Sequence, residues 1–325
     1  MQRPDIFLTR IQIEPTNRCN ARCVICRRTH WNRETGDLSL ENFKTILDKL
    51  PKTERIHLQG QGEPLLNAEL DIMVRLARQR GMRVGLSTNA SLLNKNRATK
   101  LFAAGINRLN FSIDTTDTEL FQKTRPGPPL DRILQNIETT VLERERQRIS
   151  DLHLSVTVVA KPSTIHSLPD VVDWAANLKM DSVLLQNVNY DFVQYDRIID
   201  DRIMEVDIQK YDEYTTIAQR IAEKKGLPLL LPTLTPGKNI QCGWPHQGCN
   251  ITWDGYITLC CLQPDPDICC FGNIFHDGFE KIWNNDLYRQ FRKSFDKGEA
   301  VLCSKCPALY GNMWHDSETP VRNQN

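Results

Sequence analysis

The chain has 325 residues, of which 40% are hydrophobic and 25% charged, and 41 Lys and Arg side chains almost balance 40 Asp and Glu side chains. This composition excludes collagen, coiled coil and a disordered chain, and the formal net charge of +1 gives no overall field that would attract nucleic acid or an anionic membrane. No apolar run approaches the roughly 18 residues that a membrane span needs, so we expect a cytoplasmic protein without a membrane segment.

Short β-rich runs alternate with helical patterns over the first 190 residues. The predicted strands are Leu8–Glu14, Arg55–Gln59, Arg83–Ser87, Arg108–Ile113, His153–Ala160 and Ser182–Gln186. The helices predicted between them are Leu40–Leu50, Ala68–Gln79, Asn94–Ala104, Asp131–Gln147 and Leu168–Leu178. This alternation predicts an α/β fold with a parallel sheet under an outer layer of helices. Periodicity leaves open whether the sheet is doubly wound or a partial barrel, but both bind ligands at the carboxyl ends of their strands.

A smaller domain is predicted to follow. Ile208–Lys225 has the pattern of a helix ended by Gly226, and Leu227–Pro236, with three prolines, is predicted to be a linker or an edge segment. The residues after it are rich in Cys and Trp and contain a hairpin signal at Trp253–Tyr256 and a helical pattern at Phe279–Trp283. We therefore expect one domain over residues 1–226 and a second over residues 227–325.

Eleven cysteines lie in two groups, with three at Cys19, Cys23 and Cys26 and eight between Cys242 and Cys306. An odd number, grouped in this way, argues against a disulfide framework and predicts metal binding. Three thiolates directly after the first strand suit an iron–sulfur cluster, or zinc with His30 as the fourth ligand. If the group is a [4Fe–4S] cluster, one iron takes no protein ligand from this loop and is open to a cofactor.

The Cys-x₃-Cys-x₂-Cys spacing resembles the signature of the radical S-adenosylmethionine (radical SAM) superfamily. The resemblance covers about residues 8–190 and implies a partial (β/α)6 TIM-like barrel. It further implies that Cys19, Cys23 and Cys26 bind a [4Fe–4S] cluster and that the amino and carboxylate groups of S-adenosylmethionine (SAM) chelate the fourth iron.

The ends of the next three strands resemble the SAM-binding segments of that superfamily. Gln59–Pro64 is similar to the Gly-Gly-Glu-Pro segment that meets the SAM amino group, Ser87–Asn89 to a segment near the ribose or carboxylate, and Asn110–Asp114 to the strand that reaches the ribose. The position before the third cysteine, often an aromatic residue against adenine, is Ile25 here. The cofactor-binding residues implied by this resemblance are Gly60, Gly62, Glu63, Pro64, Ser87, Asn89, Ser112, Asp114 and Ile25.

The second cysteine group resembles the auxiliary-cluster domains called SPASM and their shortened form, called twitch. This resemblance implies one auxiliary [4Fe–4S] cluster with the ligands Cys242, Cys260, Cys303 and Cys306. Cys261 adjoins Cys260, and neighbours in an extended strand point to opposite faces, so we favour Cys260 as the ligand. We interpret Cys249, Cys269 and Cys270 as buried thiols without a ligand role. The alternative is that one of them replaces Cys242 or binds a second cluster.

The resemblance implies an enzyme that cleaves SAM reductively to a 5′-deoxyadenosyl radical, which removes a hydrogen atom from the substrate. The auxiliary cluster would accept an electron from the substrate radical or bind the substrate, and the electron donor would be a flavodoxin or a ferredoxin. No catalytic side chain is assigned. The alternative from another class is a zinc-stabilised binding module without catalysis.

The sequence leaves the substrate open among a small molecule, a peptide and a protein side chain, with nucleic acid disfavoured by the charge balance. The first strand begins too early for a leader-peptide-binding domain to precede it, which disfavours a peptide. Residues 27–39 resemble maturases of tungsten-cofactor oxidoreductases. Candidate substrate contacts are Arg27, Arg28, Tyr190, Asp191, Tyr195 and Asp196.

Overall fold

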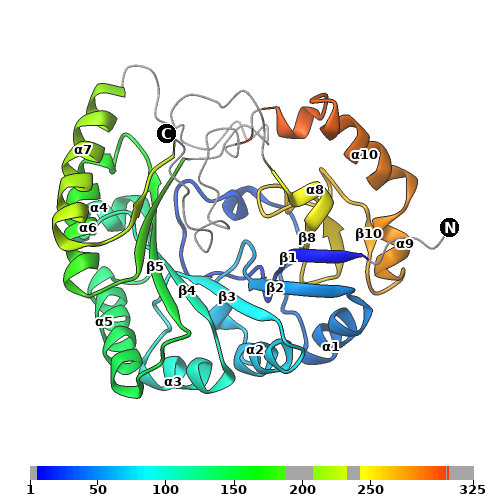
Figure 1. Cartoon of the computed structure of the whole chain (residues 1–325), viewed down its shortest axis with the longest axis horizontal. Helices are drawn as coiled ribbons and strands as arrows, with labels where there is room; N and C mark the ends of the chain where they lie inside the picture. The colour runs from blue at the N-terminus through cyan, green and yellow to red at the C-terminus, as the bar shows by residue number, and fades with distance from the viewer. Residues whose placement is uncertain (1–5, 188–207, 233–241, 305, 307–325) are drawn as a thin grey trace.

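The computed structural model describes residues 6–187, 208–232, 242–304 and 306. Within them, ten strands form one sheet in the order β10-β9-β8-β1-β2-β3-β4-β5-β6-β7. The strands from β1 to β7 pair in parallel and span Phe7–Ile13, Lys52–Leu58, Arg83–Thr88, Arg108–Ser112, His153–Ala160, Ser182–Asn187 and Leu229–Leu230. Figure 1 shows this sheet curving around a central space, which makes it a partial barrel as predicted.

Helices cover the outer face of the barrel (Figure 1). They are α1 (Leu40–Lys49), α2 (Leu70–Gln79), α3 (Lys95–Ala104), α4 (Thr118–Thr124), α5 (Leu130–Gln147), α6 (Leu168–Asn177) and α7 (Ile208–Lys225), and α7 packs on α6. Ser39 caps α1 by accepting a hydrogen bond from the backbone N–H of Asn42 at 3.1 Å. Gly105 ends α3 with a φ of 89°, a left-handed conformation that glycine adopts without strain.

Alternate residues of each strand face opposite sides of the sheet. Outward residues such as Ile11, Ile56 and Leu109 are apolar and at most 1% exposed beneath the helices. Inward residues are polar: the Asn110 side-chain oxygen accepts hydrogen bonds from the hydroxyls of Ser155 at 3.0 Å and Thr157 at 2.9 Å. The interior of this barrel is therefore polar, whereas branched aliphatic side chains fill a closed TIM barrel.

The C-terminal part continues the same sheet beyond β1. Its elements are α8 (Trp244–Gln247), β8 (Gly248–Ile251), β9 (Tyr256–Thr258), β10 (Gly272–Asn273), α9 (Phe279–Trp283) and α10 (Asp286–Asp296). β8 runs parallel to β1, and β8, β9 and β10 pair in antiparallel fashion. These elements lie across the barrel from α6 and α7 (Figure 1).

The predicted elements are confirmed to within three residues at each end, and the hairpin at Trp253–Tyr256 connects β8 to β9. The expected edge segment contains β7, while α4, α8 and α10 were not predicted. The domain boundary at residue 227 stays a prediction. Of the helices that the structure describes, none has the length and apolarity needed to cross a membrane.

Candidate metal and cofactor site

The loop that leaves β1 carries the first three cysteines and is fastened to the end of α4. The backbone N–H of Arg22 donates to the carbonyl of Pro126 at 2.7 Å, and that of Val24 donates to the carbonyl of Thr124 at 3.1 Å. Gly127 follows with a φ of 138°, and a Cβ there would lie 2.8 Å from the carbonyl oxygen of Asn20. The segment from Thr124 to Gly127 therefore fixes the cysteine loop in place.

The thiols of this loop influence one another. Burial raises the pKa of Cys19 to about 11, with smaller contributions from Glu63, Cys23 and Cys26. Burial also raises the pKa of Cys26, with Cys23 as the next cause. These thiols hold their protons at neutral pH until a metal replaces the protons. Three adjacent soft donors fit an iron–sulfur cluster.

Two predicted glycines allow the end of β2 to pack against the cysteine loop. A Cβ on Gly62 would lie 2.4 Å from the carbonyl oxygens of both Thr16 and Arg18. A Cβ on Gly60 would lie 2.1 Å from Cγ of Glu14. A larger residue at Gly62 would displace the backbone that leads to the cysteines, and one at Gly60 would displace the buried Glu14 side chain.

Glu63, the predicted contact of the SAM amino group, ties the end of β2 to the end of β3. Its carboxylate accepts hydrogen bonds from the Thr88 hydroxyl at 2.6 Å, the Asn89 N–H at 2.8 Å and the Leu65 N–H at 3.2 Å. Pro64 begins a single helical turn beside it. Glu63 is only 3% exposed, and burial raises its pKa. The contact with SAM stays a prediction.

The other predicted cofactor residues lie along the barrel opening. The Ser87 hydroxyl lies 2.9 Å from Nε2 of His57, and Asn89 donates from its side chain to the side-chain oxygen of Asn20 at 2.9 Å. Ser112 ends β4, and Ile25 is half-buried in the cysteine loop. The structure therefore brings residues of β3, β4 and the cysteine loop to the same end of the barrel.

Asp114 is fully buried and lies between two cations that the sequence did not identify. Its carboxylate accepts two hydrogen bonds from the Arg125 guanidinium, both at 2.9 Å, and one from Nζ of Lys161 at 2.7 Å. Burial opposes the charge on Asp114, but Arg125 and Lys161 outweigh it and hold the pKa of Asp114 well below its usual range. Burial lowers the pKa of Arg125, but the negative charge of Asp114, together with that of Cys23 and Cys26, outweighs this effect and raises it. The ion pair thus connects β4 to the cysteine loop.

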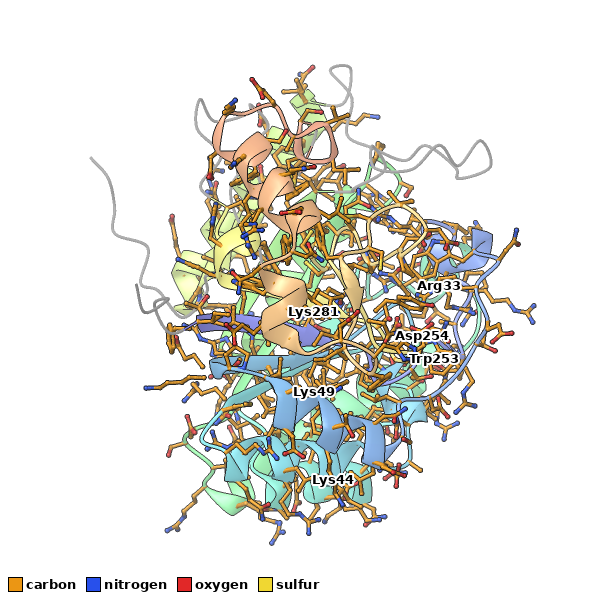
Figure 2. The ribbon with its side chains drawn as sticks, turned by 90° about the vertical axis from the view of Figure 1, so that its right-hand side faces the viewer. Arg33, Lys44, Lys49, Trp253, Asp254 and Lys281 are labelled. Carbon is orange, nitrogen blue, oxygen red and sulfur yellow. The ribbon has the colours of Figure 1, made fainter. Side chains whose placement is uncertain are left out.

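A second buried network joins the cysteine loop to the C-terminal part. Arg33 binds both carboxylate oxygens of Asp254, at 2.9 and 3.1 Å, and lies 4.0 Å from the Glu14 carboxylate. Glu14 also accepts from the Trp253 N–H at 3.4 Å. Figure 2 shows Arg33 beside Trp253 and Asp254. Arg33 is the cation that compensates the buried Glu14.

Arg27 and Arg28, which we considered as substrate contacts, donate to the protein backbone. Nη1 of Arg27 donates to the carbonyl of Leu262 at 2.6 Å, and Nη2 of Arg28 donates to the carbonyl of Ala21 at 3.2 Å. Leu262 directly follows Cys261, so Arg27 connects the two cysteine groups. Residues 190–196 and the His30 side chain lie outside the described residues.

The four predicted auxiliary ligands influence one another electrostatically, and Cys261 belongs to the same set of interacting thiols. Burial raises the pKa of Cys260 well above its ordinary value, and the neighbouring thiols Cys261, Cys306 and Cys242 raise it further. Burial raises the pKa of Cys303 to about 12, with Cys306 and Cys242 next. Both Cys260 and Cys261 are near this group, so the choice between them stays a prediction.

The other three C-terminal cysteines have different surroundings. Cys249 is buried near Arg292 and Tyr288, and burial raises its pKa. Cys269 and Cys270 are neighbours, and Cys269 also lies near Cys303. All eleven cysteines lie in the described part of the chain, and none forms a disulfide. Among the described side chains, no three His, Cys, Asp or Glu residues converge around a single metal ion.

Two family profiles match the chain. The radical SAM superfamily profile matches residues 13–184, slightly more than half of the chain. The profile of an iron–sulfur cluster-binding domain, SPASM, matches residues 242–307.

Curated relatives share about a quarter of their residues with this chain. The tungsten-containing aldehyde ferredoxin oxidoreductase cofactor-modifying protein of Pyrococcus furiosus is 27% identical over 306 residues, covering 87% of this chain and 82% of the relative. The "Probable GTP 3′,8-cyclase" of Methanocaldococcus jannaschii is 27% identical over 269 residues, covering 78% of this chain and 85% of the relative. The PqqA peptide cyclase of Bradyrhizobium diazoefficiens is 25% identical over 260 residues, covering 77% of this chain and 66% of the relative.

Solved structures share the fold. The structure of Streptococcus suis SuiB bound to S-adenosylmethionine superposes with a TM-score of 0.69 at 17% sequence identity. The aligned region covers 94% of this chain and 76% of the SuiB chain. The structure of anSMEcpe with bound AdoMet superposes with a TM-score of 0.72 at 15% sequence identity. The aligned region covers 94% of this chain and 84% of the anSMEcpe chain.

Proposed function

Because the chain belongs to the radical SAM superfamily and carries a SPASM iron–sulfur domain, we propose that it is a maturase that modifies a cofactor or a cofactor precursor. The two domains imply a SAM-binding [4Fe–4S] cluster, SAM and auxiliary iron–sulfur binding. Cofactor modification is supported by the Pyrococcus furiosus relative, whose similarity extends over 87% of this chain. The family assignment supports an enzyme over the zinc-stabilised binding module.

When bound, the reduced cluster and SAM supply a 5′-deoxyadenosyl radical that removes a hydrogen atom from the substrate. The chain's own residues place these groups. Cys19, Cys23 and Cys26 would hold the SAM-binding cluster, and Gly60 and Gly62 allow the end of β2 to pack against the loop that carries these cysteines. We propose that the surrounding barrel limits the access of water to this site, which would protect a reactive radical from side reactions.

The auxiliary cluster would be held by Cys242, Cys260, Cys303 and Cys306, and we propose that it accepts an electron from the substrate. Support comes from the hydrogen bond between Arg27 and the Leu262 carbonyl at 2.6 Å, because it connects the first cysteine loop to the auxiliary cysteines. The external electron donor, a flavodoxin or a ferredoxin, and a cytoplasmic location stay predictions.

A peptide substrate is the second candidate, since the PqqA peptide cyclase aligns with 77% of this chain. Co-production with a tungsten-containing oxidoreductase separates the candidates. We expect the cofactor extracted from that oxidoreductase to differ in mass when this chain is present. An unchanged cofactor together with a modified peptide would favour the second candidate.

The radical chemistry is tested with anaerobically purified protein. We expect dithionite-dependent formation of 5′-deoxyadenosine, and Cys23→Ala should abolish it because one of three cluster ligands is lost. Cys249→Ala is the matched control, since Cys249 is fully buried and is not among the predicted ligands of the SAM-binding cluster, so this variant should retain cleavage. Equal cleavage by the Cys23→Ala variant would overturn the proposed function.

A further inference from the structure

Gln263 is a buried residue whose side-chain polar atoms have no hydrogen-bond partner. It is 1% exposed, and neither its amide nitrogen nor its amide oxygen bonds to any residue that the structure describes. Burying an amide in this state is costly, and in native proteins such groups are nearly always bonded to protein, to ordered water or to a ligand. The Gln263 amide therefore requires a partner from outside the polypeptide.

A tight turn places this amide beside an auxiliary cysteine. The Gln263 N–H donates to the Cys260 carbonyl at 3.0 Å, and the two residues pair as an isolated antiparallel bridge. Directly opposed residues in such a pair have side chains on the same face, with Cβ atoms about 4.5–5.5 Å apart. The Gln263 amide and the Cys260 thiol consequently extend from one face of the turn.

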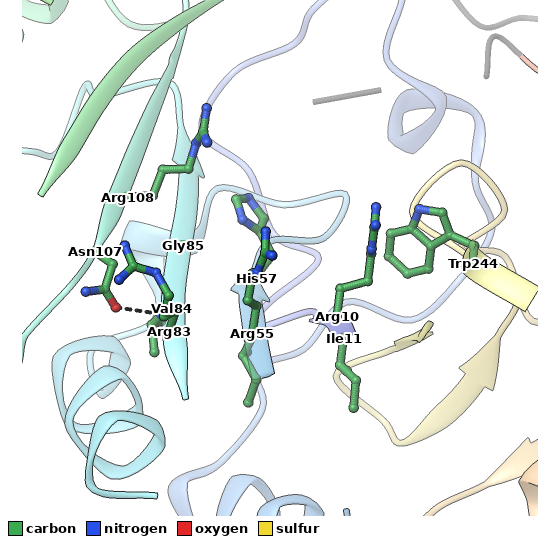
Figure 3. Close-up of a pocket in the computed structure, with 11 residues that line it drawn as sticks. Arg10, Ile11, Arg55, His57, Arg83, Val84, Gly85, Asn107, Arg108 and Trp244 are labelled. Carbon is green, nitrogen blue, oxygen red and sulfur yellow. Dashed lines mark hydrogen bonds between the residues drawn. The ribbon is translucent and has the colours of Figure 1, made fainter. Parts of the chain in front are cut away.

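The neighbouring Cys261 has other surroundings. Burial raises the pKa of Cys261, whereas the nearby guanidinium of Arg10 lowers it. Figure 3 shows Arg10 beside Trp244, where both line a cavity of about 60 Å³ inside the barrel. Since adjacent residues of an extended segment point to opposite faces, Cys260 is the cysteine that shares a face with Gln263.

Polar groups close to Gln263 along the chain are already bonded. The Leu262 carbonyl accepts from Nη1 of Arg27 at 2.6 Å, and the Asp265 carboxylate accepts from the Asp267 N–H at 3.0 Å. The acceptors that the amide N–H can reach on its own face of the turn are therefore sulfur atoms.

We propose that the side-chain N–H of Gln263 donates a hydrogen bond to a sulfur of the auxiliary cluster and thereby raises the reduction potential of that cluster. The inference rests on the proposed function, in which Cys260 is one of the cluster ligands. Reduction adds negative charge to the cluster, and a hydrogen-bond donor favours the more negative state. Hydrogen bonds to the sulfurs are among the determinants of iron–sulfur potentials. A higher potential makes the auxiliary cluster a better acceptor for an electron from the substrate.

The test is a potentiometric titration of the reconstituted protein, with dithionite as the reductant and EPR spectroscopy as the readout. Cys23→Ala, which loses a ligand of the SAM-binding cluster, identifies the auxiliary signal. Gln263→Leu removes the donor at similar volume and should lower the equilibrium constant for reduction of the auxiliary cluster at least about threefold, or about 28 mV for one electron. The potential of the SAM-binding cluster should not change. Gln290→Leu, the same replacement at an exposed position on α10, is the matched control and should leave both potentials unchanged.

Pulsed EPR gives a second measurement that needs no variant. In wild-type protein whose glutamines are isotopically labelled at the side-chain amide nitrogen, we expect a hyperfine coupling between the reduced auxiliary cluster and that nitrogen. Absence of the coupling, a decrease smaller than about threefold in Gln263→Leu, or an equal decrease in Gln290→Leu would overturn the proposal. A wild-type protein without any auxiliary signal would instead refute the auxiliary cluster of the proposed function, so the two failures are distinguishable.

Discussion

Asp114→Asn is expected to destabilise the protein strongly. The substitution keeps the size of the side chain but removes the charge that faces Arg125 and Lys161, of which Lys161 is 0% exposed. Removing one partner of a buried ion pair costs about 3–5 kcal/mol, because the other charge stays buried without compensation. Since a domain is stable by only about 5–15 kcal/mol, this loss is a large part of the total.

Urea unfolding followed by tryptophan fluorescence measures the loss, with Asp151→Asn as the control. Asp151 pairs with Arg83 but its side chain is 57% exposed, so its loss should cost less than about 1 kcal/mol. Because the pKa of Asp114 is lower in the folded chain, its stabilising effect is present above about pH 4 and disappears as the pH falls further. A loss below about 1 kcal/mol at pH 7 would refute the assignment of Asp114 as a structural ion pair.

Three further predictions concern other parts of the site. Arg33→Ala should lower the free energy of unfolding by about 3 kcal/mol because Glu14 stays buried, whereas Arg18→Ala, in a pair that is 45% and 39% exposed, should cost less than about 1 kcal/mol. Gly62→Ala should reduce the iron bound per chain, measured by colorimetric iron assay, because its Cβ would meet two carbonyl oxygens at 2.4 Å; Gly278→Ala, with nothing within 4 Å, should not. Unfolded His57 binds a proton near pH 6.5 and folded His57 only near pH 3, so wild type should lose about 1.4 kcal/mol between pH 7.5 and 5.5, and His57→Gln should lose correspondingly less.

The fold could be predicted well because local signals and tertiary packing agree. The strand His153–Ala160 and the helix Ile208–Lys225 have the predicted bounds, since β-branched runs and helical periodicity in these segments match the faces that are buried. Helix α4 was missed because its seven residues bury only Phe121 and Thr124, too few for a periodic pattern. The two cysteine groups could also be recognised from the positions of the cysteines along the chain.

The charged partners of the site could not be predicted in the same way. Arg125 and Lys161 lie 11 and 47 residues from Asp114 along the chain, and no local pattern connects them. The inward face of the strands was different, because the alternation of polar and apolar residues, as in Arg108–Ser112, is visible in the sequence. That alternation indicates a polar barrel interior once the strands are placed side by side.

The pairing of β8 with β1 makes the C-terminal cysteine domain a structural part of the barrel. The register that joins Arg10 to Gly248 and Ile13 to Ile251 places β1, which precedes the first cysteine group, beside β8 of the C-terminal part in one hydrogen-bonded sheet. A chain cut before residue 242 would leave one side of β1 without a partner, and unpaired strand edges invite association between molecules. Exchange of this domain between related enzymes must therefore preserve that register, since the spacing of the two redox centres is built into it.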